Sequence, residues 1–263
     1  MRKWKFILLA ILFLILFVSL YVFSQLDFDL PSSQWRIPIY PNVEKNRYDE
    51  DLFHTEKGLR YYDSPTASVG IDVSSHQGDI DWVALRESGV DFAILRVGYR
   101  GYTDGGIFAD STFVTNLQKA KEAGVQIGVY FFSQAISAEE AREEAEFVLE
   151  SLQGISLDLP VYFDWEFVED ESARTNDASS ETVTNCATVF CQMVEKAGYK
   201  AGVYFNQSLG YFTLNLEQLK DYDFWLAEYR ETPDFYYHFH MWQYSDSGSL
   251  SGITGKVDLN IRF

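Results

Sequence analysis

A repeated unit of helix, glycine and apolar strand is the feature that most constrains the fold of this chain of 263 residues. The unit occurs at residues 88–95, 123–130 and 197–204. In each copy a helical stretch ends at a glycine, the residue favoured just past a helix C-terminus, and an apolar strand follows. The first two copies start 35 residues apart and the next two 74 apart, so one further unit is expected between them.

That further unit is visible after Ser137, which with Glu140 forms the pattern of a capping box at a helix N-terminus. Apolar residues then recur at helical spacing as far as Leu152, and Gly154 precedes the next strand. We expect the acids of this segment on the solvated side of the helix. They are Glu139, Glu140, Glu143, Glu144, Glu146 and Glu150.

Near-continuous apolar strands that alternate with amphipathic helices indicate a parallel sheet covered by helices. The pattern changes after Asn206, where residues 224–229, 240–244 and 256–259 read as strands with little helix between them. We therefore expect an α/β fold, a modified (β/α) TIM-like barrel with a mostly-β C-terminal part. An open, doubly wound sheet is the alternative. In both folds, chemistry is expected at the carboxyl ends of the strands.

The N-terminus predicts a membrane anchor. Residues 6–23 form an uncharged apolar stretch, long enough to approach the thickness of a bilayer core. Bases precede it and acids follow, so the positive-inside rule places the N-terminus in the cytoplasm and the rest outside. We favour an uncleaved single-pass transmembrane segment over residues 1–24. The alternative is a signal peptide whose cleavage would release a secreted protein.

Residues 25–68 read as an extracytoplasmic linker, because they hold four of the six prolines and lack clear periodicity. Residues 58–62 are expected to form a short strand packed on the body. Residues 69–263 are long enough for one catalytic domain with a substantial core.

Charge excludes some partners. After residue 24 the chain carries 18 bases against 39 acids, a net charge of −21. Nucleic acid and anionic lipid are poor partners for such a surface, and solubility alone also explains the charge.

The two cysteines, Cys186 and Cys191, are five apart on an expected helix and so face different directions. We interpret them as packed thiols and not as a disulfide. The chain has no Cys/His cluster that suggests zinc.

An acidic pair closes the apolar run 159–163. Asp164 and Glu166 are two apart at a strand end, so their side chains share one face, roughly 7 Å apart at the backbone. Two neighbouring carboxylates repel, and one of them tends to keep its proton near neutral pH. A protonated acid beside an ionised one is what cleavage of a glycosidic bond requires.

Two further carboxylates lie in apolar surroundings, Asp72 in the first expected barrel strand and Asp258 in the last. First and last strands are neighbours in a closed barrel, so these four carboxylates are expected to converge at one mouth. The alternative for Asp72 is a hydrogen-bond acceptor for the turn at Ser74 and Ser75. The alternative for the four together is a Ca²⁺ or Mg²⁺ site, which lacks the usual short ligand loop here.

Aromatic residues make up 17% of the chain, and many fall at or near predicted strand ends. Their rings suit the faces of sugars, and the alternative for each is a place in the core. The expected substrate contacts are Tyr99, Tyr130, Tyr204, Trp225, Tyr229 and Trp242.

Seven segments together resemble glycoside hydrolase family 25, the Chalaropsis-type lysozymes or N-acetylmuramidases. They are GIDVSSHQGDIDW from Gly70, DFAILRVGY from Asp91, GVYFFS from Gly128, LPVYFDWE from Leu159, GVYFN from Gly202, FWLAEY from Phe224, and MWQYSDSG from Met241 through GKVDLN from Gly255. Their order and spacing cover nearly all of residues 69–263.

The resemblance implies hydrolysis of the β-1,4 bond between N-acetylmuramic acid and N-acetylglucosamine in peptidoglycan. It implies Glu166 as general acid, Asp164 as its partner, and Asp72 and Asp258 as active-site carboxylates. We expect a monomer that binds peptidoglycan glycan strands and needs neither metal nor cofactor. The alternatives are a non-catalytic glycan-binding protein on the same fold and a chitinase-like hydrolase.

Overall fold

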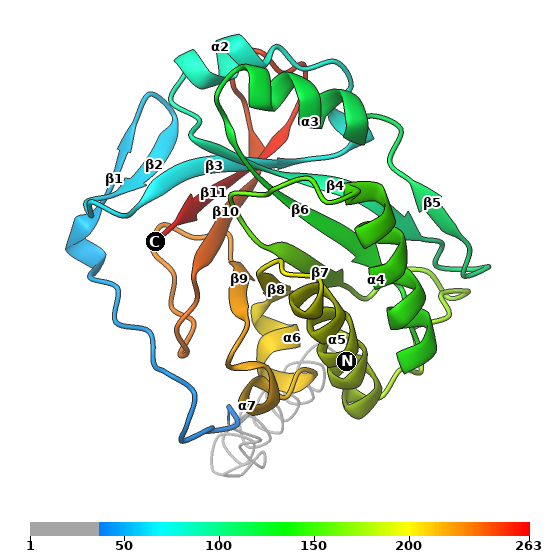
Figure 1. The fold of residues 1–263 in the computed structure, drawn as a ribbon. Helices are drawn as coiled ribbons and strands as arrows, with labels where there is room; N and C mark the ends of the chain where they lie inside the picture. Colours follow the sequence, from blue (N-terminus) through cyan, green and yellow to red (C-terminus); the bar gives the residue numbers. More distant parts are fainter. Residues whose placement is uncertain (1–36) are drawn as a thin grey trace, which may run out of the picture. The chain divides into compact units, whose positions relative to one another are not determined.

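A closed barrel forms the centre of the molecule in the computed structural model, which describes residues 37–263 (Figure 1). Its sheet has the spatial order β3 (Ser68–Val73), β11 (Val257–Arg262), β10 (Met241–Gly248), β9 (Asp223–Ala227), β8 (Ala201–Asn206), β7 (Val161–Trp165), β6 (Gln126–Ser133), β4 (Phe92–Arg100) and β5 (Ile107–Ala109). Because β3 also pairs with β4, the sheet closes and leaves β5 outside the ring. The predicted barrel is confirmed, and the open doubly wound sheet is excluded.

The strand directions separate the two parts of the barrel. β3, β4, β6, β7, β8, β9 and β10 pair in parallel where they are neighbours, whereas β11 runs antiparallel to both β10 and β3. This register places Asp258 directly opposite Asp72. The expectation that the first and last strands are neighbours is therefore confirmed.

Helices cover the outside of the parallel part (Figure 1). They are α2 (Trp82–Glu87), α3 (Phe113–Glu122), α4 (Ala138–Leu152) and α5 (Ser180–Lys196), followed by the short α6 (Gln207–Phe212) and α7 (Leu216–Leu219). A serine caps each of the two long helices, since Ser137 accepts from the Glu140 N–H and Ser179 from the Thr182 N–H. After Asn206, where little helix was predicted, the two short helices α6 and α7 still occur, and the described chain forms no helix beyond α7.

The glycines of the repeat end the helices as expected. Gly89, Gly124 and Gly198 have φ of +105°, +74° and +92°, in the left-handed region that favours glycine. Each therefore reverses the chain from a helix into the next strand.

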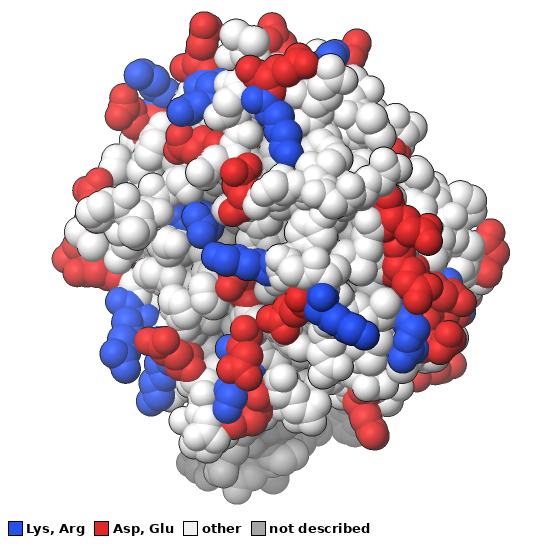
Figure 2. Space-filling model, in the orientation of Figure 1, with Lys and Arg blue, Asp and Glu red and all other residues white. Residues whose placement is uncertain are grey.

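The interpretation of the α4 acids was wrong for Glu144, which is fully buried and pairs with Arg100 at 2.7 Å. Glu140 completes only half of the predicted capping box, because its carboxylate accepts from the Ile136 N–H and pairs with Arg174. Helical periodicity could not reveal Arg100 or Arg174 as ion-pair partners, because both arginines lie far from α4 in sequence. Acidic side chains nevertheless gather on the side of the molecule that α4 occupies (Figures 1 and 2).

Small residues inside the barrel make room for large aromatic ones. A Cβ on Gly70 would lie 2.4 Å from the Phe92 ring, and one on Gly202 would lie 2.4 Å from the Tyr162 ring. The glycines therefore allow these rings to fill the barrel interior together with the buried Trp225. Trp225 contacts Tyr162 and Tyr204 edge-on, with ring centroids 5.1 and 4.7 Å apart. This packed layer supports the mouth of the barrel.

The chain before the barrel also packs on it, and Pro38–Phe263 form one compact unit. A 3-10 turn (Glu50–Leu52) leads into the hairpin of β1 (Phe53–Glu56) and β2 (Leu59–Tyr62). Leu59 is buried, and Tyr48 stacks on Phe263 with centroids 3.8 Å apart. The short strand predicted at residues 58–62 is thus confirmed.

The predicted transmembrane segment lies outside the described residues. Between residues 37 and 263, no helix has the length and apolar character needed to cross a membrane. Cys186 and Cys191 are both buried and unpaired, which confirms that they are packed thiols.

Candidate active site

Four carboxylates line one cavity of about 210 Å³ at the mouth of the barrel: Asp72, Asp164, Glu166 and Asp258. They come from β3, the end of β7, the residue after β7, and β11. β3 and β7 end at this mouth and the antiparallel β11 begins there, so strand direction alone brings the four together. The cavity is the place where a barrel of this kind is expected to hold its ligand.

Trp165 explains how its two neighbours reach the cavity. Its ring is buried and its indole N–H donates to the Ala135 carbonyl at 3.0 Å. Because side chains alternate along a strand, Asp164 and Glu166 must face the opposite way. Both line the cavity, as the spacing of the acidic pair predicted.

Asp72 is held by two side-chain amides. Gln243 Nε2 and Asn260 Nδ2 each donate to its Oδ2 at 2.8 Å. Burial raises the pKa of Asp72 to about 6, and the two amide donors oppose the rise. Donors of this kind favour the ionised carboxylate, so Asp72 is the member of its pair that carries charge.

Asp258 is the protonated member of that pair. Burial, and after it the charge of Asp72, raise the pKa of Asp258 to about 8. At neutral pH its proton is therefore retained and available for a hydrogen bond to Asp72.

The alternative role for Asp72 was wrong. The turn after β3 uses other groups, because the Ser74 N–H donates to Gln77 Oε1 and the Ser75 N–H donates to Asp110 Oδ2, both at 2.9 Å. Asp72 is thus free to face the cavity.

Gln243 connects the acidic pair to the aromatic wall. Its Oε1 accepts from the hydroxyls of Tyr204 and Tyr229, each at 3.0 Å, while its Nε2 donates to Asp72. Both tyrosine protons are directed to Gln243, so the oxygens of Tyr204 and Tyr229 can only accept hydrogen bonds from a ligand. Sequence reasoning missed Gln243 and Asn260 as site residues, because alternation along a strand gives the face of a side chain and does not identify Asp72 as its distant partner.

One carboxyl oxygen of Asp164 has no hydrogen-bond donor among the described residues. The residue is 5% exposed, and its Oδ1 has no hydrogen-bond partner among the described residues. Burial, then the charges of Glu166 and Asp72, hold the pKa of Asp164 well above its ordinary value. A ligand that offers an N–H or O–H group would satisfy this oxygen.

Glu166 is fixed through its backbone. Its carbonyl accepts from Gln134 Nε2 at 2.8 Å, and the buried Gln134 accepts in turn from the Thr175 hydroxyl at 3.0 Å. Its carboxyl group remains at the cavity, where burial and then the charge of Asp72 raise its pKa to about 7. Such a group can donate a proton near neutral pH.

The structure brings four of the six expected aromatic contacts to the cavity: Tyr130, Tyr204, Trp225 and Tyr229. It does not bring Tyr99, which stacks on Phe108 with centroids 5.4 Å apart. Trp242 is fully buried on the opposite face of β10 from Gln243, and its indole donates to the Glu228 carbonyl.

Two further cavities share lining residues with the central one, and we call the three together the groove. One, of about 540 Å³, shares Glu166, Tyr204 and Tyr229 with the central cavity. The other, of about 500 Å³, is reached past Tyr229 and lies against Arg60 and Tyr244. Tyr229 lines all three and is 53% exposed, so a ligand along the groove would pass its ring. The groove suits an extended ligand and not a small compact one.

A resident metal has no evident ligands in this part of the chain. Across residues 37–263, no group of three or more His, Cys, Asp and Glu side chains is arranged to hold an ion. Among the cavity carboxylates, Asp72 accepts from two side-chain amides, and Oδ1 of Asp164 has no hydrogen-bond partner among the described residues.

Comparisons with known proteins identify the same region. The model of the family Glycosyl hydrolases family 25 matches residues 71–253. An autolytic lysozyme of Clostridium acetobutylicum is 32% identical over 192 residues, which cover 73% of this chain and 54% of that protein. This chain therefore spans about half the length of that relative.

Solved structures share the fold. A family 25 glycosyl hydrolase from Bacillus anthracis has a TM-score of 0.64 and 25% identity, over 80% of this chain and 95% of that one. The modular autolysin LytC from Streptococcus pneumoniae, in complex with a synthetic peptidoglycan ligand, has a TM-score of 0.68 and 25% identity. That match covers 80% of this chain and 52% of LytC.

Proposed function

Because the chain belongs to glycosyl hydrolases family 25, we propose that it is a lysozyme-type peptidoglycan hydrolase. The bond cleaved is the β-1,4 linkage between N-acetylmuramic acid and N-acetylglucosamine. The observation that carries this proposal is the convergence of four carboxylates in an aromatic-walled cavity within a longer groove. Carboxylates supply the acid chemistry, and aromatic rings suit the sugar faces.

Glu166 acts as the general acid in this proposal. It protonates the oxygen of the leaving sugar, and for that its carboxyl group must hold a proton before the reaction. Its raised pKa of about 7 supports the role. The ionised Asp72 contributes to that rise, so the amides that keep Asp72 charged also help to keep Glu166 protonated.

Asp164 assists the substrate's own acetamido group. The carbonyl oxygen of that group attacks the anomeric carbon while the bond to the leaving oxygen breaks, and water later opens the resulting ring. A substrate N–H that donates to Asp164 favours the ionised form of this carboxyl, and the carboxylate then orients the amide and stabilises the positive charge that develops on it. The unpartnered Oδ1 of Asp164 supports this role, since a substrate N–H would be its missing donor.

We propose further that residues 6–23 anchor the protein in the cytoplasmic membrane as a single-pass segment, with the catalytic domain outside. The apolar stretch and its flanking charges support this location. A tethered enzyme would meet the cell wall at a high local concentration.

Mass spectrometry of the products from purified peptidoglycan tests the activity. New muramic acid at the reducing end is the expected result, and the Glu166→Gln protein serves as the matched control. Products with glucosamine at the reducing end would refute the proposed bond. Binding without products would indicate a glycan-binding protein, and cleavage of chitin oligomers in place of peptidoglycan would indicate a chitinase-like enzyme.

A further inference from the structure

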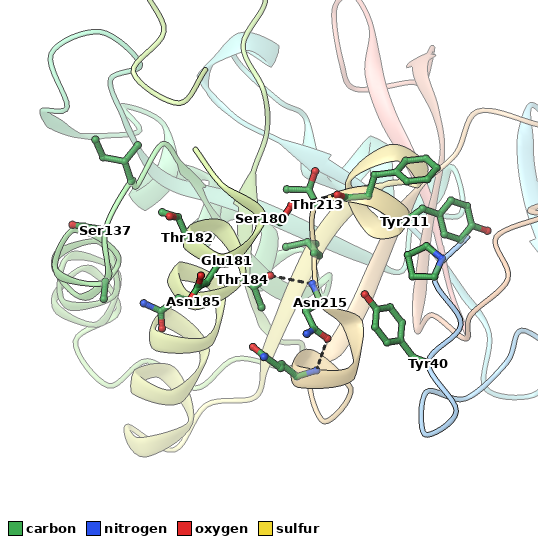
Figure 3. A pocket seen from close by; sticks show the side chains of 16 residues that line it. Tyr40, Ser137, Ser180, Glu181, Thr182, Thr184, Asn185, Tyr211, Thr213 and Asn215 are labelled. Atoms are coloured by element: carbon green, nitrogen blue, oxygen red, sulfur yellow. Dashed lines mark hydrogen bonds between the residues drawn. The ribbon is translucent and has the colours of Figure 1, made fainter. Parts of the chain in front are cut away.

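A second large cavity lies outside the barrel, between α5 and α6 (Figure 3). Its volume is about 880 Å³, against about 210 Å³ for the catalytic cavity, and lies in the range of cavities that bind small molecules. We call it the α5–α6 trough. Hydroxyl groups line much of it, from Ser137, Ser180, Thr182, Thr184 and Thr213.

Amides and aromatic rings complete the lining. Asn185 on α5 and Gln218 on α7 add two side-chain amides to the lining, and neither amide group makes a hydrogen bond within the described part of the chain. Tyr40 and Tyr211 form the wall on the α6 side, and the hydroxyl of Tyr40 points toward the trough (Figure 3). Hydroxyls and amides beside tyrosine rings match the alternating polar edges and apolar faces of a sugar.

The trough is nearly free of charge. Glu181 is the one charged side chain among its lining residues, although 23% of the chain is charged. A cationic ligand would find one partner here and an anionic ligand none. The lining therefore favours an uncharged polar ligand over a charged peptide.

The position of the trough relates it to the catalytic groove. α4 follows β6 and α5 follows β7, so both helices begin at the end of the barrel that carries the catalytic cavity. α6 connects the two cavities, because Gln207 and Ser208 at its start line the groove, and Tyr211 and Phe212 at its end line the trough. A six-residue helix is about 9 Å long, a separation that a polymer of several sugars can span.

We propose that the α5–α6 trough is a second binding site for an uncharged segment of the same glycan polymer that the groove cleaves. The inference rests on the proposed function, because it takes its ligand from the proposed substrate. A polymer held at both sites would dissociate more slowly than one held at the groove alone. The trough would thus favour long strands and leave the cleavage of short ones unaffected.

The test removes the amides of α5 and α7 from the trough, with the double variant Asn185→Ala/Gln218→Ala. Its control, Thr115→Ala/Gln118→Ala, removes two exposed polar side chains from α3. Each is combined with Glu166→Gln for binding to purified, peptide-free glycan strands whose muramic acid carboxyl groups have been converted to amides, so that the strands are uncharged, and kept with Glu166 for kinetics. We expect the dissociation constant for long strands to rise about tenfold in the trough variant, as for one or two lost hydrogen bonds.

The kinetic arm separates this inference from the proposed function. The trough variant should keep the wild-type kcat/KM on a short soluble glycan fragment, and its KM on long strands should rise. Unchanged binding of long strands would overturn the inference while wild-type activity upholds the function. An equal loss on the short fragment would also overturn it, because the residues would then act through the groove. Displacement of long strands by free stem peptide, and not by free glycan, would assign the trough to peptide and overturn it as well.

Discussion

Replacing Glu166 with glutamine should abolish catalysis and also stabilise the folded domain at alkaline pH. Burial and the charge of Asp72 raise the pKa of this carboxyl from its ordinary value of 4.5 to about 7. A carboxyl with a raised pKa binds its proton more tightly in the folded state than in the unfolded chain. Its contribution to stability is therefore complete below pH 4.5 and is lost as the pH rises through 7.

The size of the effect follows from the two pKa values. Their difference corresponds to about 3 kcal/mol, at about 1.4 kcal/mol for each pKa unit. Glutamine is nearly isosteric and stays neutral at every pH. Relative to wild type, the free energy of unfolding of Glu166→Gln should thus be higher by up to about 3 kcal/mol at pH 8, and by about 1 kcal/mol at pH 5.

Urea unfolding of both proteins at pH 5, 6, 7 and 8 measures this difference, and a wall-clearing assay measures activity. Activity should fall by at least about a hundredfold, the lower range for general acid catalysis. Glu122→Gln, an exposed change on α3, is the control and should not show the same dependence on pH. A stability difference that is independent of pH, or a variant less stable than wild type at pH 8, would refute the reasoning.

Four other predictions concern the site and the location. Gln243→Glu places a carboxylate against Asp72 and removes a donor to a charged group, so kcat should fall about thirtyfold and the pH profile of activity should shift. The exposed control Gln118→Glu should show neither effect. An unchanged pH profile in Gln243→Glu would exclude the role of Gln243 in positioning Asp72. Asp164→Asn should keep partial activity, and NMR of fresh product should show retained configuration; an inverted anomer or a glycosyl ester trapped on Asp164 would contradict substrate assistance. EDTA should leave the activity of the purified domain unchanged, and a loss that Ca²⁺ or Mg²⁺ restores would revive the metal alternative. Full-length protein should sediment with membranes and resist carbonate extraction, whereas a mature N-terminus at Gln25 would indicate a cleaved signal peptide.

The acidic residues of the site could be predicted because strand periodicity is a local property. Asp164 and Glu166 are two apart in one strand, and that spacing alone puts both on the same face. The pairing of Asp72 with Asp258 needed one more step, the closure of the barrel, which the repeated unit implied. The structure contains both arrangements.

The groups that tune these acids could not be predicted with the same means. Gln243 and Asn260 reach Asp72 from 171 and 188 residues away along the sequence. Glu144 is an acid that we expected in solvent with the others of α4, yet it is buried and pairs with Arg100 from β4. A local pattern shows which way a side chain points along its own element, and it carries no information on which distant group will lie there.

The sequence by itself determined the helix–glycine–strand order, the shared face of the acidic pair and the family, because each depends on residues close together in the chain or on their linear order. Only the tertiary structure decided that Asp258 keeps its proton beside a charged Asp72, that Asp164 has a free oxygen, and that Trp242 is core while Gln243 joins the site. Protonation and burial depend on the surroundings that the closed barrel creates, and those surroundings come from strands far apart in sequence.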